Sequence, residues 1–224
     1  MISNSSEYLN LKSENELLSE ENTRLKNLLA KNNFNVINID SVINDSVKYH
    51  QKYTYTNAKI INNNYSKTFN FLTIDKGKNQ NIDKEMAVIN SRGIIGITEV
   101  TYNKYTRVQS ILNKNSGINA RLKGNTFYYG TLKWNSKDYN VVQLHDIPRQ
   151  APLKIGDTIE TGGKSTIFPE GIPIGTIHKI NTGNTADNKV DVKLFNDMSN
   201  LGYVYVIKNL HKEEILSLEN TTNE

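Results

Sequence analysis

The residues in this sequence that could most readily take part in catalysis or binding are four histidines and a short run of glycine, lysine and serine. The histidines are scattered, at His50, His145, His178 and His211. A serine protease needs a base histidine, a buried aspartate and a serine beside an oxyanion hole. The nearest run, Thr161-Gly162-Gly163-Lys164-Ser165, does not place its serine in a frame that hydrolases use. The sequence therefore predicts no catalytic residue.

Two other patterns resemble binding sites only in part. Gly163-Lys164-Ser165 matches the end of a phosphate-binding loop, but Thr158 stands where the first glycine belongs. Prolines from Pro169 onward also oppose the helix that must follow such a loop. His145-Asp146 could begin a metal site, yet no second histidine follows at ligand spacing, and cysteine is absent. We expect a solvated turn, a partly exposed histidine at a strand end, and no cofactor or metal.

The formal net charge of +4 and the pI of about 9.0 permit contact with nucleic acid, anionic lipid or acidic polymers. The lysines are dispersed among acidic residues without a run of four, which favours a solvated surface. Tyrosines between lysines would suit a barrel that binds nucleic acid, but no signature of that class is present.

No apolar run reaches the roughly 20 residues of a membrane helix, and no signal peptide is visible.

The element that could position a functional surface most clearly is a helix over residues 7–30. Apolar or asparagine residues recur there at alternating spacings of three and four, on a narrow stripe typical of a coiled-coil seam. The seam residues are Tyr8, Leu11, Asn15, Leu18, Asn22, Leu25 and Leu29. An asparagine at an a position pairs best with its twin in a parallel partner, which favours two strands. We therefore predict that Leu11, Asn15, Leu18, Asn22, Leu25 and Leu29 mediate dimerisation.

Charged residues beside the seam agree with pairing. Glu7 and Glu21 at g positions would face Lys12 and Lys26 at the following e positions of a partner. The alternative is a surface helix that packs its leucines on its own domain. Because three heptads are marginally stable alone, we expect a longer upstream helix or a membrane anchor to help hold the pair together.

From Lys52 onward, about twelve short runs with β character are separated by glycine, asparagine and aspartate. In residues 118–123 apolar side chains alternate with Asn119, Arg121 and Lys123, as in a strand buried on one face. This texture predicts barrels or sandwiches. A hydrophobic content of 37% suits two small cores better than one large core. The glycines expected to shape the turns are Gly93, Gly96, Gly156, Gly171 and Gly175.

Several strand-and-turn motifs follow one another in a distinctive order. They are Asn70-Phe71-Leu72-Thr73-Ile74-Asp75-Lys76-Gly77, Met86-Ala87-Val88-Ile89, Gly93-Ile94-Ile95-Gly96, Gly156-Asp157-Thr158-Ile159-Glu160-Thr161-Gly162 and Ile167-Phe168-Pro169-Glu170-Gly171-Ile172-Pro173-Ile174-Gly175. Each motif alone is weak. In this order, behind a leucine and asparagine helix, they resemble the bacterial cell shape-determining family MreC over nearly the whole chain. Asp146-Ile147-Pro148 and residues 203–210 resemble its Bacteroidetes branch.

The resemblance implies a mainly β fold, with an N-terminal coiled-coil helix followed by two small six-stranded β-barrels. It also implies a periplasmic protein held at the bacterial inner membrane by an N-terminal helix that this chain lacks. We expect a coiled-coil dimerisation helix at residues 1–33, a first barrel at 34–102 and a second at 103–195. Residues 196–208 are a candidate to complete the first barrel, and residues 209–224 form a charged C-terminal tail.

The same resemblance implies a non-enzymatic, homodimeric scaffold of the cell-elongation (rod-shape) complex, which organises peptidoglycan synthases. The implied partners are MreD, the elongation transpeptidase (a penicillin-binding protein) and, indirectly, the MreB filament, with no nucleic acid. Two alternatives stay open. One is an envelope hydrolase, because the barrels of this family resemble those of chymotrypsin-like proteases, although a fold alone does not carry chemistry. The other is a coiled-coil adaptor that binds nucleic acid.

Overall fold

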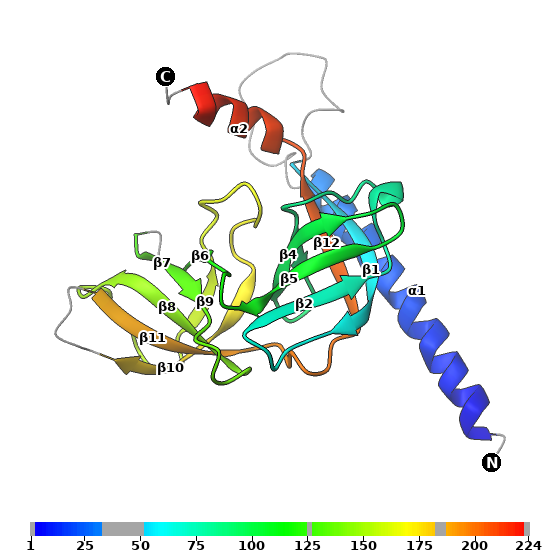
Figure 1. Ribbon diagram of the computed structural model, residues 1–224, viewed down its shortest axis with the longest axis horizontal. Helices are drawn as coiled ribbons and strands as arrows, with labels where there is room; N and C mark the ends of the chain where they lie inside the picture. Colours follow the sequence, from blue (N-terminus) through cyan, green and yellow to red (C-terminus); the bar gives the residue numbers. More distant parts are fainter. Residues whose placement is uncertain (1–2, 33–51, 125–126, 182–186, 222–224) are drawn as a thin grey trace. The chain divides into compact units, whose positions relative to one another are not determined.

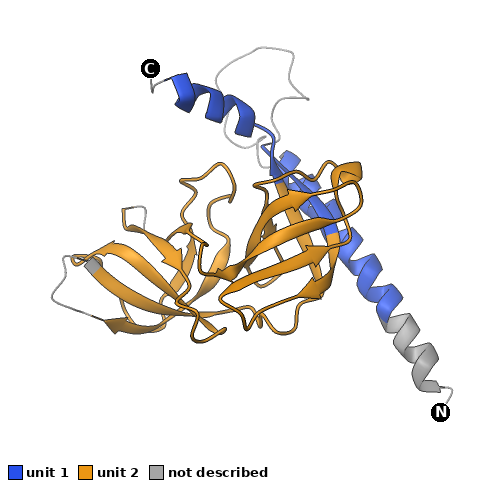
Figure 2. Cartoon of the chain, viewed as in Figure 1, with its two compact units in different colours: residues 1–57, 208–224 blue, residues 58–207 orange. Residues whose placement is uncertain are grey.

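The structure is a computed structural model in which a long N-terminal helix precedes a chain of β-strands (Figure 1). The described residues are 3–32, 52–124, 127–181 and 187–221. His50 and the expected start of the first barrel at residue 34 lie outside them. The chain divides into one compact unit of residues 1–57 and 208–224 and a second of residues 58–207, shown in blue and orange in Figure 2.

The first barrel closes through six strands in the order β1-β12-β3-β4-β5-β2. Their bounds are Tyr53–Asn63 (β1), Phe69–Ile74 (β2), Ala87–Ile89 (β3), Ile94–Thr101 (β4), Thr106–Asn113 (β5) and Tyr203–Asn209 (β12). A short 3-10 helix, η1, spans Lys78–Gln80. The strands turn side chains such as Leu72, Ile74 and Val108 inward, where they are fully buried. Closure gives each of these strands a neighbour on both sides along part of its length.

The second barrel also closes through six strands, in the order β10-β11-β8-β7-β6-β9. Their bounds are Ile118–Leu122 (β6), Tyr129–Lys133 (β7), Val141–Pro148 (β8), Thr158–Thr161 (β9), Pro173–Asn181 (β10) and Asp187–Leu194 (β11). Its core includes Leu132, Leu144, Val190 and Val192, all fully buried. These residues alternate with polar neighbours, which is the period-two pattern of a strand with one buried face.

The predicted fold class is confirmed: the chain is mainly β, with an N-terminal helix and two six-stranded barrels. The expected boundary at 102/103 is wrong, because β5 belongs to the first barrel. β5 pairs with β4 through a tight turn and with β2 on its other side, so the first barrel cannot close without it. The chain passes to the second barrel between β5 and β6. β12 lies between β1 and β3 in the first barrel.

Two helices flank the barrels in sequence. α1 spans Ser3–Asn32 and is rich in leucine and glutamate, which favour helix. α2 spans Lys212–Thr221, where the sequence predicted only a charged, frayed tail. Glu213 and Glu214 lie in its first turn, where acidic side chains stabilise the positive end of the helix dipole. No helix in the described part of the chain has the length and apolar character needed to cross a bilayer.

Two of the glycines expected in turns lie instead within strands. A Cβ added to Gly96 in β4 would clash with the carbonyl oxygen of Gln109 in β5. A Cβ added to Gly175 in β10 would clash with the carbonyl oxygen of Lys193 in β11. Both glycines therefore allow neighbouring strands to approach closely in a small barrel.

The two barrels contact each other within residues 58–207. In the segment that joins β11 to β12, the Asn196 side-chain Nδ2 donates to the Ile94 carbonyl of β4 at 3.0 Å, and Asn196 is buried. The rings of Tyr65 and Tyr139 meet edge to face, with centroids 5.4 Å apart. Such aromatic pairs contribute about 0.5–1.5 kcal/mol beyond their area. The barrels are thus joined by specific contacts as well as by the chain.

Candidate functional site

The predicted seam residues lie along α1, and those described turn their side chains to solvent. Leu18, Leu25 and Leu29 are 60%, 43% and 60% exposed. Asn15 and Asn22 are exposed as well. The Asn22 Nδ2 donates to the Leu18 carbonyl at 2.8 Å, one turn earlier in the same helix. Among the described residues, the seam side chains from Asn15 to Leu29 are therefore left uncovered.

Two more leucines widen this apolar stripe. Leu17 and Leu28 are 62% and 43% exposed, and they occupy c and g positions next to the seam. The stripe is therefore broader than the narrow a and d seam that the sequence predicted. The side chain of Leu11 lies outside the described residues.

In the part of α1 whose side chains are described, residues 12–31, the covered face carries no leucine. Its buried or half-buried residues are Ser19, Thr23, Lys26, Asn27 and Ala30. Asn27 Nδ2 donates to the Tyr55 carbonyl at 3.0 Å, and its Oδ1 accepts from the Tyr55 N–H at 2.8 Å. The amide thus satisfies both backbone groups of Tyr55, as a neighbouring strand would. These contacts tie α1 to the start of β1 and argue against a helix that packs its leucines on its own domain.

Two of the four charged residues predicted beside the seam, Glu21 and Lys26, already have partners within one chain. The Glu21 carboxylate forms an ion pair of 2.8 Å with Arg24, three residues later in α1. The Lys26 Nζ lies 5.7 Å from the centre of the Tyr55 ring. An interchain pair between Glu21 and Lys26 would therefore require both side chains to exchange partners.

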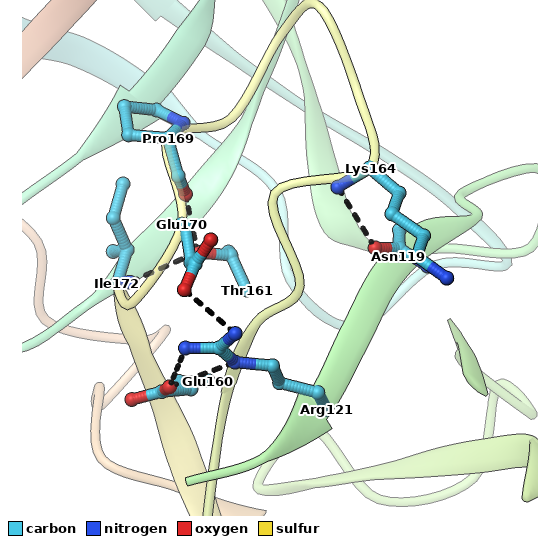
Figure 3. A network of polar contacts seen from close by, with 8 residues as sticks. All are labelled: Asn119, Arg121, Glu160, Thr161, Lys164, Pro169, Glu170 and Ile172. Carbon is cyan, nitrogen blue, oxygen red and sulfur yellow. Dashed lines mark hydrogen bonds and ion pairs between the residues drawn. The ribbon is translucent and has the colours of Figure 1, made fainter. Parts of the chain in front are cut away.

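A second cluster of polar side chains lies on the outside of the second barrel (Figure 3). Arg121 in β6 and Glu160 in β9 are direct cross-strand neighbours. Arg121 Nε and Nη2 donate to Glu160 Oε1 at 3.0 and 2.8 Å. Arg121 Nη1 pairs with Glu170 Oε1 at 2.6 Å. The side chains of Arg121 and Glu160 are only 9% and 8% exposed, whereas Glu170 is 58% exposed.

The β9–β10 loop folds over this cluster and contains the glycine, lysine and serine run. Thr161 Oγ1 donates to the Pro169 carbonyl at 2.5 Å and accepts from the Ile172 N–H at 2.9 Å. The Lys164 Nζ lies 3.8 Å from the centre of the Tyr129 ring. The chain continues from this loop into strand β10, not into the helix of a phosphate-binding loop. The run therefore caps a barrel, and its lysine stacks on an aromatic ring.

The three histidines in the described part of the chain lie on separate elements and do not converge. His145 is in β8, His178 in β10, and His211 between β12 and α2. Burial lowers the pKa of His145 below its ordinary value; Lys189 and Lys133 lower it further, while Asp146 and Asp191 act in the opposite direction. Lysines beside a histidine disfavour a bound cation. Within the described ranges, no group of three histidine, aspartate or glutamate side chains could hold a metal ion.

Two of these arrangements were missed by sequence reasoning. Asn27 occupies an f position, where a polar residue is ordinary, so no local signal marks it. Arg121 was expected to face solvent with Asn119 and Lys123. It does lie on that face of the strand, but the β9–β10 loop covers it. A contact between segments about forty residues apart leaves no local pattern.

Comparison with known proteins identifies close similarity to one family. Residues 60–208 match the family described as "Rod shape-determining protein MreC, barrel core". The cell shape-determining protein MreC of Listeria monocytogenes is 28% identical over 205 residues, covering 90% of this chain and 64% of that protein. The chain spans between half and two thirds of the length of the curated relatives it matches.

Solved structures of similar proteins have the same fold. A structure of the Listeria monocytogenes protein superposes with a TM-score of 0.66 and 27% identity, covering 91% of both chains. A second, from a complex between the penicillin-binding protein PBP2 and MreC of Helicobacter pylori, has a TM-score of 0.54 and 17% identity. It covers 71% of this chain and 99% of the matched chain. The resemblance of this chain to the Bacteroidetes branch of the family stays a prediction.

Proposed function

The chain belongs to the MreC family of rod shape-determining proteins, and on this premise we propose that it is a dimeric, non-enzymatic scaffold of the cell-elongation complex. Two chains would pair through α1 and present their barrels to peptidoglycan synthases. Paired copies let weak contacts gain avidity through high local concentration. The observation that carries this proposal is the exposed leucine stripe on a helix whose covered face is bonded to the same chain.

The proposed dimer forms in parallel through Leu11, Asn15, Leu18, Asn22, Leu25 and Leu29. Burying a leucine side chain fully contributes about 1.5–3 kcal/mol. The heptad spacing and the two asparagines favour a second copy of this chain over an unrelated helix, because asparagines at a positions are satisfied best by identical partners. Anchoring α1 to Tyr55 also orders the helix before pairing, which lowers the entropic cost of association.

A penicillin-binding protein is the partner with the most direct support, because the similar Helicobacter pylori protein was solved in complex with one. We further propose contact with MreD and an indirect link to the MreB filament. The family resemblance supports both of these proposals. It also supports a location in the periplasm, at the inner membrane.

We propose that the protein has no catalytic activity. The described histidines lie on different elements, and His145 has two lysines nearby, which does not suit the acid–base role of a hydrolase triad. Labelling by a fluorophosphonate probe, or turnover of a peptide substrate, would favour an envelope hydrolase instead. A salt-dependent gel shift with single-stranded nucleic acid would favour the adaptor alternative.

The dimer is tested by changing leucines inside and outside the predicted seam. The seam variant carries Leu18→Ser and Leu25→Ser. The control variant carries Leu17→Ser and Leu28→Ser, whose side chains are exposed to nearly the same extent as the seam pair. Sedimentation equilibrium of the full chain measures the dimer dissociation constant of each variant.

We expect the wild type to dimerise with increasing concentration, the seam variant to stay monomeric, and the control to lose less than about tenfold in affinity. A monomeric wild type at every concentration would refute the dimer. Equal losses in the two variants would contradict a two-stranded seam and indicate packing through a broad apolar face.

A further inference from the structure

Lysines that are far apart in the sequence gather on one side of the second barrel. Lys133 in β7 pairs with Gln143 in β8, which pairs with Asp191 in β11. Asp191 pairs in turn with Lys179 in β10, so one cross-strand row runs over four strands. These strands lie side by side in Figure 1. Lys189 and Lys193 flank Asp191 along β11 on the same face. We call Lys133, Lys179, Lys189 and Lys193 the basic face.

The four lysines of the basic face outnumber its central carboxylate, Asp191, which keeps its negative charge. Asp191 Oδ1 accepts from Gln143 Nε2, and its Oδ2 accepts from Asn181 Nδ2, both at 3.3 Å. All four lysines are exposed, and none forms an ion pair with a described carboxylate. The pKa of His145 is lowered mainly by burial; Lys189 and Lys133 lower it further, while Asp146 and Asp191 raise it.

The chemistry of the face limits what it can bind. Its outward side chains are mainly threonine, glutamine, asparagine and lysine, with Asp191 at the centre. Two aromatic residues lie at its margins: Tyr129 is half-buried at the start of β7, and Phe195 is 39% exposed just after β11. Lysines are point charges that lack the forked geometry of arginine, so they do not favour one specific carboxylate or phosphate. The charges extend in two directions, about 14 Å across three strand spacings and about 13 Å along β11. A single linear polyanion would therefore contact only part of the face.

We propose that the basic face binds the surface of an anionic lipid bilayer. Such a surface presents anionic headgroups in two dimensions, which matches the distribution of the lysines. Attraction of this kind is electrostatic and non-specific, and salt screens it. The contact does not depend on pairing through α1, so the result of the dimer experiment does not decide it.

The experiment uses the full chain and sedimentation with lipid vesicles. One set contains equal parts of phosphatidylglycerol and phosphatidylcholine, and the other contains phosphatidylcholine alone. The face variant carries Lys133→Gln, Lys179→Gln, Lys189→Gln and Lys193→Gln. The control variant carries Lys67→Gln, Lys78→Gln, Lys84→Gln and Lys104→Gln, all at exposed positions of the first barrel and its loops. Each variant takes the formal net charge from +4 to zero.

We expect the wild type to bind only the anionic vesicles and to dissociate near 1 M salt, where the Debye length falls to about 3 Å. Partition of the face variant should fall by at least about tenfold, and that of the control by less than about threefold. Three results would overturn the proposal. They are no binding by the wild type, equal losses in both variants, or equally tight binding to soluble polyglutamate. Circular dichroism confirms that both variants are folded.

Discussion

Arg121 pairs with two carboxylates of unequal exposure, and this difference predicts which of them stabilises the second barrel. The perturbations are Glu160→Gln and Glu170→Gln, which remove a charge while keeping the shape of the side chain. Judged by distance alone, Glu170 should matter more, because its ion pair of 2.6 Å is the shorter. Judged by burial, Glu160 should matter more, because its side chain is 8% exposed and that of Glu170 is 58% exposed.

Burial decides the magnitude. Removing one partner of a buried ion pair costs about 3–5 kcal/mol, because the other charge is left without compensation in a medium of low polarity. The glutamine in Glu160→Gln keeps one acceptor oxygen for Arg121, so we expect a loss of about 2–4 kcal/mol in the free energy of unfolding. An exposed pair contributes about 0–1 kcal/mol, so Glu170→Gln should lower that free energy by less than about 1 kcal/mol.

Urea unfolding followed by tryptophan fluorescence measures both changes. Trp134, the only tryptophan, is buried at the end of β7 in the same barrel, and its Nε1 donates to the Asp138 carbonyl at 2.8 Å. The double variant Arg121→Leu with Glu160→Leu should recover most of the loss, since apolar pairs often replace buried ion pairs without cost. Equal destabilisation by Glu160→Gln and Glu170→Gln would refute the reasoning from burial.

Three further predictions concern other parts of the chain. Asn27→Ala removes both hydrogen bonds to Tyr55 and should cost about 1–2 kcal/mol in the local free energy of opening, so that amide hydrogen exchange at Tyr55 becomes about tenfold faster. Asn22→Ala serves as the control. An exchange rate unchanged from wild type would contradict this prediction. The pKa of His145 is lowered in the folded state, mainly by burial. As the pH falls through about 6.5, the unfolded chain therefore binds a proton at His145 before the folded chain does, and the free energy of unfolding decreases below that pH. Thermal melts at several pH values should show a weaker pH dependence for His145→Gln, with His178→Gln as the control; an identical slope would exclude His145 as the cause. Gly96→Ala should lower the free energy of unfolding in urea by about 1–3 kcal/mol, because its Cβ would clash with the Gln109 carbonyl. In the control Gly202→Ala the new Cβ meets nothing within 4 Å, so that change should be nearly neutral. Similar losses in the two variants would argue against a close approach of β4 and β5 at Gly96.

Local patterns in the sequence were sufficient for the elements and their periodicity. The spacing of Leu18, Leu25 and Leu29 predicted a helix with an apolar stripe, and the structure leaves that stripe exposed. The alternation through Val190 and Val192 predicted a strand with one buried face, and both residues are fully buried. These features depend only on neighbours within a few residues, where the helical and extended repeats are set by backbone geometry. The ordered turn motifs were also sufficient for the family.

Only the tertiary structure decided which strand joins which barrel and which side chains meet. β5 and β12 belong to the first barrel because closure depends on pairing between strands far apart in the chain. The same pairing placed Arg121 opposite Glu160, and the β9–β10 loop then covered both side chains. It also turned dispersed lysines into the basic face through cross-strand register. Register and closure depend on long-range hydrogen bonds and packing, for which no local sequence period exists.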